Sequence, residues 1–224
     1  MSENKNFLSI PLPDNTKTGW SCGEVAAIAT LKYLNAQPAL DEDGARELTH
    51  KIPAYNTWPE QLLRIAFAYP EIHAIIYRTK TFNVPIAEHI CQSYSGVAAQ
   101  HLLEETDEND LEKALQECEK RKSYSIQNIT LETILAQVRP GRVVIPWACF
   151  DALYRENISN GFNAHYVIIT GYDLQYVYVH ECGGINKLPE ANKLIERERF
   201  MKALGPDPNF MVWSINKKFN QKFL

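Results

Sequence analysis

The chain lacks the features that mark exported and membrane-spanning proteins. It has no apolar run near the roughly 18–20 residues that cross a bilayer. Its N-terminal stretch, MSENKNFLSIPLPDN, has no apolar segment of the kind found in signal peptides. The cysteines are an odd set without a CxxC pair: Cys22, Cys91, Cys118, Cys149 and Cys182. This pattern favours free thiols in a reducing compartment. We therefore predict a cytoplasmic protein with no membrane partner, and leave open export by a route that needs no N-terminal signal.

The chain also lacks an excess of basic residues. Its 23 lysines and arginines stand against 27 aspartates and glutamates, so the net charge is −4 and no nucleic-acid partner is predicted. No internal repeat is evident. The length of 224 residues and the 45% hydrophobic content suit one domain with a buried core. We predict a single domain over residues 1–224, with an expanded helical middle at about 85–138.

The predicted elements come as helices first and an antiparallel sheet afterwards. After an extended arm over 1–19, the expected helices are 22–35, 41–51, 60–69, 85–122 with breaks near Gly96 and at 104–110, 130–141 and 196–204. Thr57 and Glu60 match a capping box for the third helix. The acidic run EETDEND (104–110) is interpreted as a solvated linker. The expected strands are 73–79, 142–148, 165–173, 175–181 and 209–215. This order predicts an α+β fold, with a helical layer facing an antiparallel sheet and the active site in the cleft between them.

Cys22 is the first candidate functional residue. It lies at the start of the small-residue helix in TGWSCGEVAAIATLKYL (18–34). The N-H groups at a helix N-terminus favour the thiolate form of a cysteine, and the thiolate is the nucleophile. Gly23 allows another backbone segment, or a substrate, to approach closely. The alternative is a small buried hydrophobic residue, and we give that interpretation to Cys91, Cys118 and Cys149.

A base and an orienting acid are predicted in the hairpin AHYVIITGYDLQYVYVHECG (164–183). His165 opens its first strand, where it can take the proton of a thiol. Glu181 ends the second strand and should come back level with His165, so it can accept the other imidazole N-H. Asp173 is interpreted as a turn residue. His180, Glu181 and Cys182 lack a second ligand pair at zinc-site spacing, so no metal and no cofactor are predicted.

Acyl transfer also needs donors for the oxyanion that forms on the substrate carbonyl. The backbone N-H of Cys22 is one candidate. Asn15 is the best amide side chain shortly before Cys22, with Thr16 and Lys17 as weaker options.

These segments together resemble the papain-like cysteine peptidases of the bacteriocin-processing (double-glycine leader) peptidase-like superfamily. CGEVAAIATLKYL, HYVIITGYD and VYVHE are similar to the family's Cys-Gly helix, His-Tyr strand and following strand. YNTWPEQLLRIAFAY and ITLETILAQVRPGRVVIPW resemble its middle elements. The resemblance implies Cys22 as nucleophile, His165 as base and Glu181 as orienting acid. Thr16 stands where the family has a glutamine, and Glu181-Cys182 stands where it has Asp-Pro.

Three functions fit this pattern. The leading one is a cysteine peptidase or amidase that cleaves a peptide or isopeptide bond through a thioester, with a peptide or protein as substrate. The second is acyl or peptidyl transfer by the same three residues, with an amine or thiol in place of water. The third is a catalytically impaired binding module of the same fold. The native substrate and the oligomeric state cannot be inferred from the sequence.

Overall fold

The structure, a computed structural model, describes residues 6–12, 21–36, 40–53, 55–155, 162–183 and 190–216. In this part of the chain the strands form one sheet of order β3-β2-β8-β4-β5-β6-β7, and β1 pairs with the end of β5. Their bounds are β1 Asn6–Phe7, β2 Ile72–Arg78, β3 Tyr124–Ile126, β4 Arg142–Cys149, β5 Ala164–Tyr172, β6 Tyr176–Glu181, β7 Glu190–Glu196 and β8 Asn209–Ile215. All neighbours are antiparallel except β2 and β3, which are parallel at one edge.

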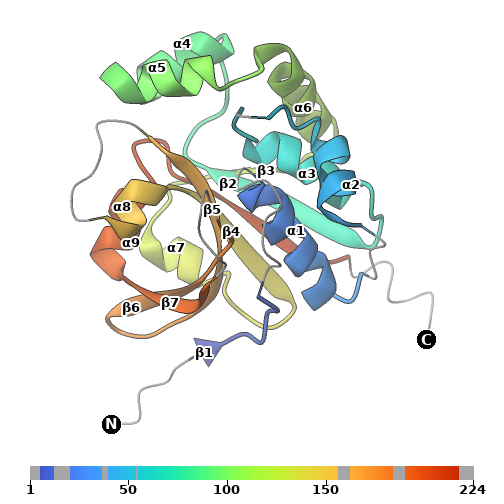
Figure 1. Cartoon of the computed structure of the whole chain (residues 1–224), viewed down its shortest axis with the longest axis vertical. Coiled ribbons are helices and arrows are strands. Elements are labelled where there is room, and N and C mark those ends of the chain that lie inside the picture. The colour runs from blue at the N-terminus through green and yellow to red at the C-terminus, as the bar shows by residue number, and fades with distance from the viewer. Residues whose placement is uncertain are drawn as a thin grey trace.

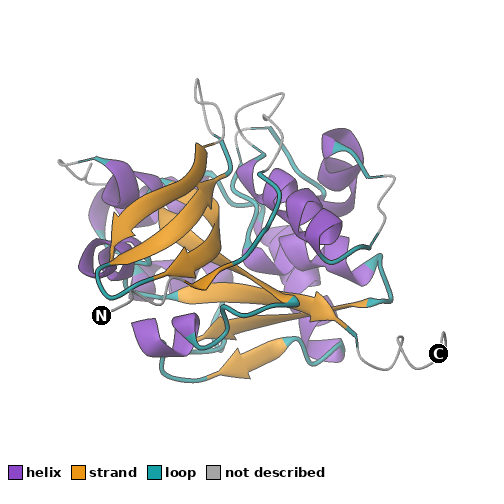
Figure 2. Cartoon of the chain, turned by 90° about the horizontal axis from the view of Figure 1, so that it is seen from below, coloured by secondary structure: helices purple, strands orange, loops and turns teal. Residues whose placement is uncertain are grey.

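The helices lie on both sides of the curled sheet (Figures 1 and 2). Their bounds are α1 Cys22–Tyr33, α2 Glu42–Thr49, α3 Pro59–Phe67, α4 Ile86–Ser93, α5 Gly96–Glu104, α6 Glu108–Lys120, α7 Leu131–Leu135, α8 Phe150–Tyr154 and α9 Arg197–Ala203. On one side α1 packs on β5, α3 packs on β2 and β8, and α6 packs on α3. On the other side α8 and α9 contact each other and the strands β4, β6 and β7. The predicted α+β class is confirmed, but the sheet is mixed rather than wholly antiparallel, and helices cover both of its sides rather than one. None of the described helices is both long and apolar enough to cross a membrane.

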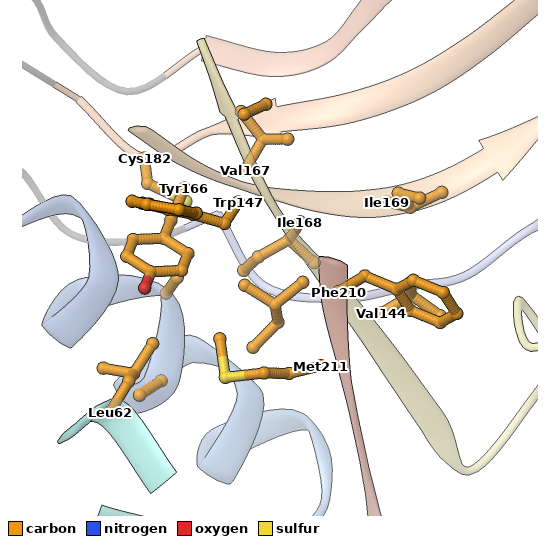
Figure 3. Packing of buried hydrophobic residues seen from close by; sticks show 14 of the residues in the cluster. Leu62, Val144, Trp147, Tyr166, Val167, Ile168, Ile169, Cys182, Phe210 and Met211 are labelled. Carbon is orange, nitrogen blue, oxygen red and sulfur yellow. The ribbon is translucent and has the colours of Figure 1, made fainter. Parts of the chain in front are cut away.

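Strand β5 is the centre of the hydrophobic core, because its side chains are buried on both faces. Figure 3 shows Tyr166 and Ile168 pointing toward the helices, near Leu62 of α3, while Val167 and Ile169 point to the opposite face. This alternation is the normal geometry of a strand. Because alternate residues of a strand share a face, His165 lies on the same face of β5 as Val167.

The hairpin of β5 and β6 differs in register from the prediction. Glu181 pairs with Val167 and is therefore two residues away from the level of His165, although still on the same face. The turn is centred on Leu174 and Gln175, because the N-H of Asp173 donates to the carbonyl of Tyr176 over 3.0 Å. The Oδ1 atom of Asp173 also accepts the N-H groups of Gln175 and Tyr176, each at 2.8 Å. The interpretation of Asp173 as a turn residue is correct.

A β-bulge interrupts the same hairpin, where Thr170 is the extra residue in β5 between the pairs of Ile169 and Gly171. The bulge is held from several directions. The carbonyl of Thr170 accepts the N-H of Leu8 over 2.7 Å. Its hydroxyl lies 2.8 Å from Oδ1 of Asn192 in β7 and 3.3 Å from the carbonyl of Tyr178. The N-terminal arm and the edge strand therefore both fix this irregularity.

Two local predictions differ from the structure. The first turn of α3 is not closed by a box of Thr57 and Glu60: the side chain of Gln61 accepts the N-H of Trp58 over 2.8 Å. Thr57 and Glu60 instead serve tertiary contacts. The acidic run 104–110 is not wholly a solvated linker either. Its last residue, Asp110, is buried and accepts a hydrogen bond from Nη1 of Arg64 over 2.7 Å. This bond connects α6 to α3.

A second buried charge network attaches the helical middle of the chain to the sheet. Arg78 of β2 donates to Glu60 of α3 over 2.7 Å and to Asp207 over 3.4 Å. Asp207 is also 3.0 Å from Nε2 of His89 in α4. Arg78 is only 2% exposed, and its guanidinium lies 4.3 Å from the ring centroid of Phe82. These contacts position α4 relative to α3 and β2.

Candidate active site

The N-terminus of α1 is fixed against α2, α3 and β5. Glu24, in the first turn of α1, accepts the hydroxyls of Thr49 and Thr57, each at 2.9 Å. The carbonyl of Thr57 in turn accepts the hydroxyl of Tyr166 in β5 over 2.7 Å. These bonds set the position of the helix start, and with it the position of Cys22.

Gly23 allows α1 to approach β5 this closely. A Cβ atom at Gly23 would lie 2.9 Å from Cδ2 and 3.0 Å from Cε2 of Tyr166. The sequence suggested that another backbone segment or a substrate would use this space, but in the structure a side chain, the Tyr166 ring, fills it.

Replacing Gly23 by alanine should therefore lower the free energy of unfolding by about 1–3 kcal/mol, the usual cost of overpacking a core. The Tyr166 ring cannot yield easily, because its hydroxyl is bonded to Thr57. Urea denaturation would measure the loss. Gly44→Ala in α2 is the matched control, since its Cβ would meet only the side chains of Leu40 at 3.1 Å and Asp41 at 3.4 Å. Equal stability of the two variants would contradict the packing argument.

His165, at the start of β5, lies between Glu181 and Cys22. Its Nε2 atom forms a hydrogen bond with Oε1 of Glu181, and the side chain of Cys22 is its other hydrogen-bonding partner. Because Nε2 faces Glu181, Nδ1 is the ring nitrogen left for the sulfur. His165 and Glu181 are 4% and 2% exposed, whereas Cys22 is half-buried. The three residues singled out in the sequence therefore lie together in the fold.

The electrostatics of this group favour a charged pair. Burial alone would lower the pKa of His165, but the negative charges of Cys22 and Glu181 and the hydrogen bonds to both raise it to about 10. Burial would raise the pKa of Glu181, but the charge of His165 and the hydrogen bond to it dominate and lower that pKa. At neutral pH the pair is imidazolium and carboxylate.

The other cysteines do not share this environment. Cys118, Cys149 and Cys182 are buried, as ordinary core cysteines are, but Cys91 is exposed and the prediction of burial is wrong there. Cys182 follows Glu181 and is fully buried, and burial is the first reason that its pKa is raised.

The remaining sequence predictions concern metal and oxyanion groups. Within the described residues, no group of three or more His, Cys, Asp or Glu side chains is arranged to hold a metal ion. His180 bonds to the carbonyl of Ile10 at 2.8 Å, and its Nδ1 accepts the N-H of Asn192 at 3.2 Å. Asn15, Thr16 and Lys17, the predicted oxyanion donors, lie outside the described residues.

Two aromatic residues near His165 were missed from the sequence. Phe150 and Tyr154 come from the short helix α8, which directly follows β4. The ring of Phe150 stands at 88° to the imidazole with centroids 5.1 Å apart, and that of Tyr154 stands at 76° and 6.4 Å. Because α8 is only about one turn long, no helical periodicity in the sequence indicated that these two rings would lie beside His165.

Known proteins resemble this chain in fold. No family model matches it, and no curated protein matches its sequence. A solved structure assigned as a C39-like peptidase from Bacillus anthracis is similar over 96% of this chain and 99% of its own, with a TM-score of 0.53 and 13% identity. The peptidase domain of Streptococcus ComA, a bifunctional ABC transporter involved in quorum sensing, aligns over 92% of this chain and 98% of its own, with a TM-score of 0.47 and 10% identity. The chain has the α+β, papain-like fold of the C39-like peptidases, which confirms the predicted resemblance at the level of the fold.

Proposed function

We propose that this protein is a cysteine peptidase or amidase in which Cys22 is the nucleophile, His165 the acid–base group and Glu181 the orienting acid. The observation that carries the proposal is the position of His165 between the two other residues. One of its ring nitrogens is hydrogen-bonded to Glu181, and its side chain also interacts with Cys22. A nucleophile, a base that contacts it and a third group that orients the base are the arrangement of a catalytic triad. The fold shared with a C39-like peptidase supports a peptide or protein substrate.

The proposed reaction begins with the thiolate of Cys22 and the imidazolium of His165. The sulfur attacks the substrate carbonyl carbon and forms a tetrahedral oxyanion. The first backbone N-H groups of α1 have no intrahelical acceptor and can donate to this oxyanion, since the first hydrogen bond of the helix is from Val25 to Ser21. His165 then gives its proton to the leaving amine, and a thioester remains on Cys22. Neutral His165 next takes a proton from water, the hydroxide attacks the thioester, and the carboxylic acid leaves as the thiolate re-forms.

The reactivity of Cys22 toward iodoacetamide tests the proposal without knowledge of the substrate. Cys22 should be alkylated fastest of the five thiols at pH 6, well below the ordinary thiol pKa of about 8.5, because His165 favours its thiolate. Labelling of each cysteine would be followed by mass spectrometry of tryptic peptides over pH 5–9.

Cys91 is the control for accessibility, because it is exposed but has no such partner in the described structure. His165→Ala should reduce the labelling rate of Cys22 at pH 6 toward that of Cys91. Labelling of Cys22 at or below the rate of Cys91 in the wild type would show that the proposed nucleophile is wrong. Incubation with a peptide library, with Cys22→Ala as the inactive reference, would then show whether water or an added amine accepts the acyl group.

A further inference from the structure

His180 connects three separate segments of the chain. It belongs to β6, and its side chain bonds to the N-terminal arm (residues 6–12) and to the edge strand β7. Its Nε2 atom is 2.8 Å from the carbonyl oxygen of Ile10, and its Nδ1 atom is 3.2 Å from the backbone nitrogen of Asn192. The side chain is buried. His180 is therefore an internal connection and not a surface residue.

These two partners fix the protonation state of the ring. A carbonyl oxygen can only accept a hydrogen bond, and a backbone N-H can only donate one. Nε2 must therefore carry the proton that is donated to Ile10, and Nδ1 must be the unprotonated acceptor of the Asn192 N-H. The two bonds exist together only in the neutral imidazole with its proton on Nε2.

The N-H of Asn192 reaches His180 because the edge strand is irregular at this point. The pairing of β6 with β7 shifts between Val179 and Glu181, and Asn192 has a left-handed φ of 50°. The Oδ1 atom of Asn192 accepts the hydroxyl of Thr170 over 2.8 Å, at the bulge of β5. Two side chains from neighbouring strands therefore hold Asn192, and of these two only His180 titrates.

A second proton on the ring would sit on Nδ1 and point at the N-H of Asn192. Two donors would then face each other, so the bond to Asn192 would be lost, whereas Nε2 would still donate to Ile10. Burial lowers the pKa of His180, and the bond to Ile10 opposes this effect. The bond to Asn192 is therefore fully present above the ordinary histidine pKa of about 6.5 and is lost as the pH falls below it.

The described side chains around His180 offer no carboxylate that would stabilise the imidazolium. The arm over 6–12 has no titratable side chain. On the same face of the sheet lie the phenols of Tyr166 and Tyr178 and the thiol of Cys182, which are uncharged in acid, and the Tyr178 hydroxyl donates to Asp173 at the turn. The strand pairing places three charged residues on the opposite face of β6 and β7: Glu181, Glu190 and Lys193.

We propose that His180 is a pH-sensitive joint, which holds β7 to β6 when it is neutral and releases Asn192 when it is protonated. The arm stays attached through Ile10 in both states. Asn192 is followed by Lys193, whose Nζ atom lies 4.4 Å from the centroid of the Tyr154 ring beside His165. Acid would therefore loosen the edge strand that packs next to the proposed catalytic residues. The joint does not require Cys22 to be reactive, so it stands apart from the proposed function.

The test is hydrogen exchange of single backbone N-H groups, followed by NMR at pH 7.5 and pH 5. Each rate is compared with that of an unstructured peptide at the same pH, which gives the protection of that group. The protection of the Asn192 N-H should fall at least about tenfold, because each pH unit below about 6.5 favours the released form by up to tenfold. The N-H of Leu8, which donates to the carbonyl of Thr170 over 2.7 Å, should keep its protection, since the arm stays bonded. Unchanged protection of Asn192, or an equal loss at Leu8, would overturn the proposal.

His180→Asn is the decisive variant, because its side-chain oxygen takes the place of Nδ1 as an acceptor but does not titrate. In this variant Asn192 should keep its protection at pH 5. His73→Asn is the matched control: it removes an exposed histidine of β2 and should leave the loss at Asn192 as in the wild type. A loss at Asn192 of the same size in His180→Asn would assign the pH response to another group and contradict the joint.

The wild type alone gives a second result if His180→Asn does not fold. The ¹⁵N chemical shifts of the His180 ring should show a proton on Nε2 and none on Nδ1 at pH 7.5. Protonation of Nδ1 should then occur in the same pH range in which Asn192 loses its protection. A proton on Nδ1 at pH 7.5, or different midpoints for the two changes, would show that His180 does not control the release of Asn192.

Discussion

His165→Ala should leave a folded protein whose turnover of a peptide substrate is at least about 10²-fold lower than that of the wild type, the lower range for losing an acid–base group. The imidazole is hydrogen-bonded to Glu181 and interacts with Cys22. Without it, the proposed mechanism has no group to protonate the leaving amine or activate water. A substrate selected from a peptide library by mass spectrometry would serve for the measurement.

Glu181→Gln should also lower turnover, by at least about 10-fold, because an amide cannot stabilise an imidazolium as a carboxylate does. Asp173→Asn is the matched control. It makes the same carboxylate-to-amide change in the same hairpin, but at the turn, where Asp173 accepts the N-H groups of Gln175 and Tyr176. Its turnover should stay close to that of the wild type. The opposite ranking of the two variants would leave His165 and Cys22 as a dyad and remove Glu181 from the mechanism.

Arg78→Met should reduce the free energy of unfolding by about 3–5 kcal/mol, the cost of removing one partner from a buried ion pair. Methionine keeps much of the volume of the side chain, but it leaves the buried carboxylate of Glu60 without its cation and leaves Asp207 with His89 alone. The cost is large because the side chains of Glu60 and Asp207 are both almost fully buried. Chemical denaturation monitored by tryptophan fluorescence would measure it.

Lys202→Met is the control for loss of a positive charge in general. Lys202 pairs with Glu198 at 2.9 Å, but both side chains are largely exposed, so the change should be close to zero. Similar effects of Lys202→Met and Arg78→Met would mean that burial of the Arg78 network does not matter for stability.

From the sequence we predicted that the three candidate residues lie close together, and they do. The predicted pairing of Glu181 was wrong, because it lies opposite Val167 and not opposite His165. Alternating apolar residues in 165–181 predicted two paired strands and a turn near Asp173. The register depends on a turn centred one residue later and on the bulge at Thr170. Thr170 is β-branched and is typical of a regular strand. Its partners, Leu8 and Asn192, lie far away in the sequence, so no local pattern indicates a bulge.

Short and polar elements were the ones that sequence reasoning missed. Helix α8 has only one turn, and β7 (EANKLIE) is an exposed edge strand with little apolar alternation. Neither has the periodicity on which such predictions depend. Because α8 was not predicted, the positions of its residues Phe150 and Tyr154 beside His165 were not predicted either.

Buried charges were missed for a different reason. Charged residues are rarely buried unless they are paired, and the pairing partners here lie far apart along the chain. Asp207 is separated from His89 by 118 positions and from Arg78 by 129. His89 therefore had no supporting pattern in the sequence, although it is 1% exposed and bonded to Asp207.

The bulge at Thr170 also determines which side chains of β5 and β6 lie on the same face of the hairpin. Successive side chains of a strand alternate between faces, so a shift of one residue reverses the face of everything beyond it. Continued without interruption from the turn, the pairing of Gly171 with Tyr178 would have placed Glu181 opposite Ile168, on the helix-facing side and away from His165. The extra residue in β5 shifts the pairing by one position, so that Glu181 lies opposite Val167 and on the same face as His165. Within these two strands, insertions or deletions of two residues keep the carboxylate and the imidazole on one face, whereas changes of one residue separate them.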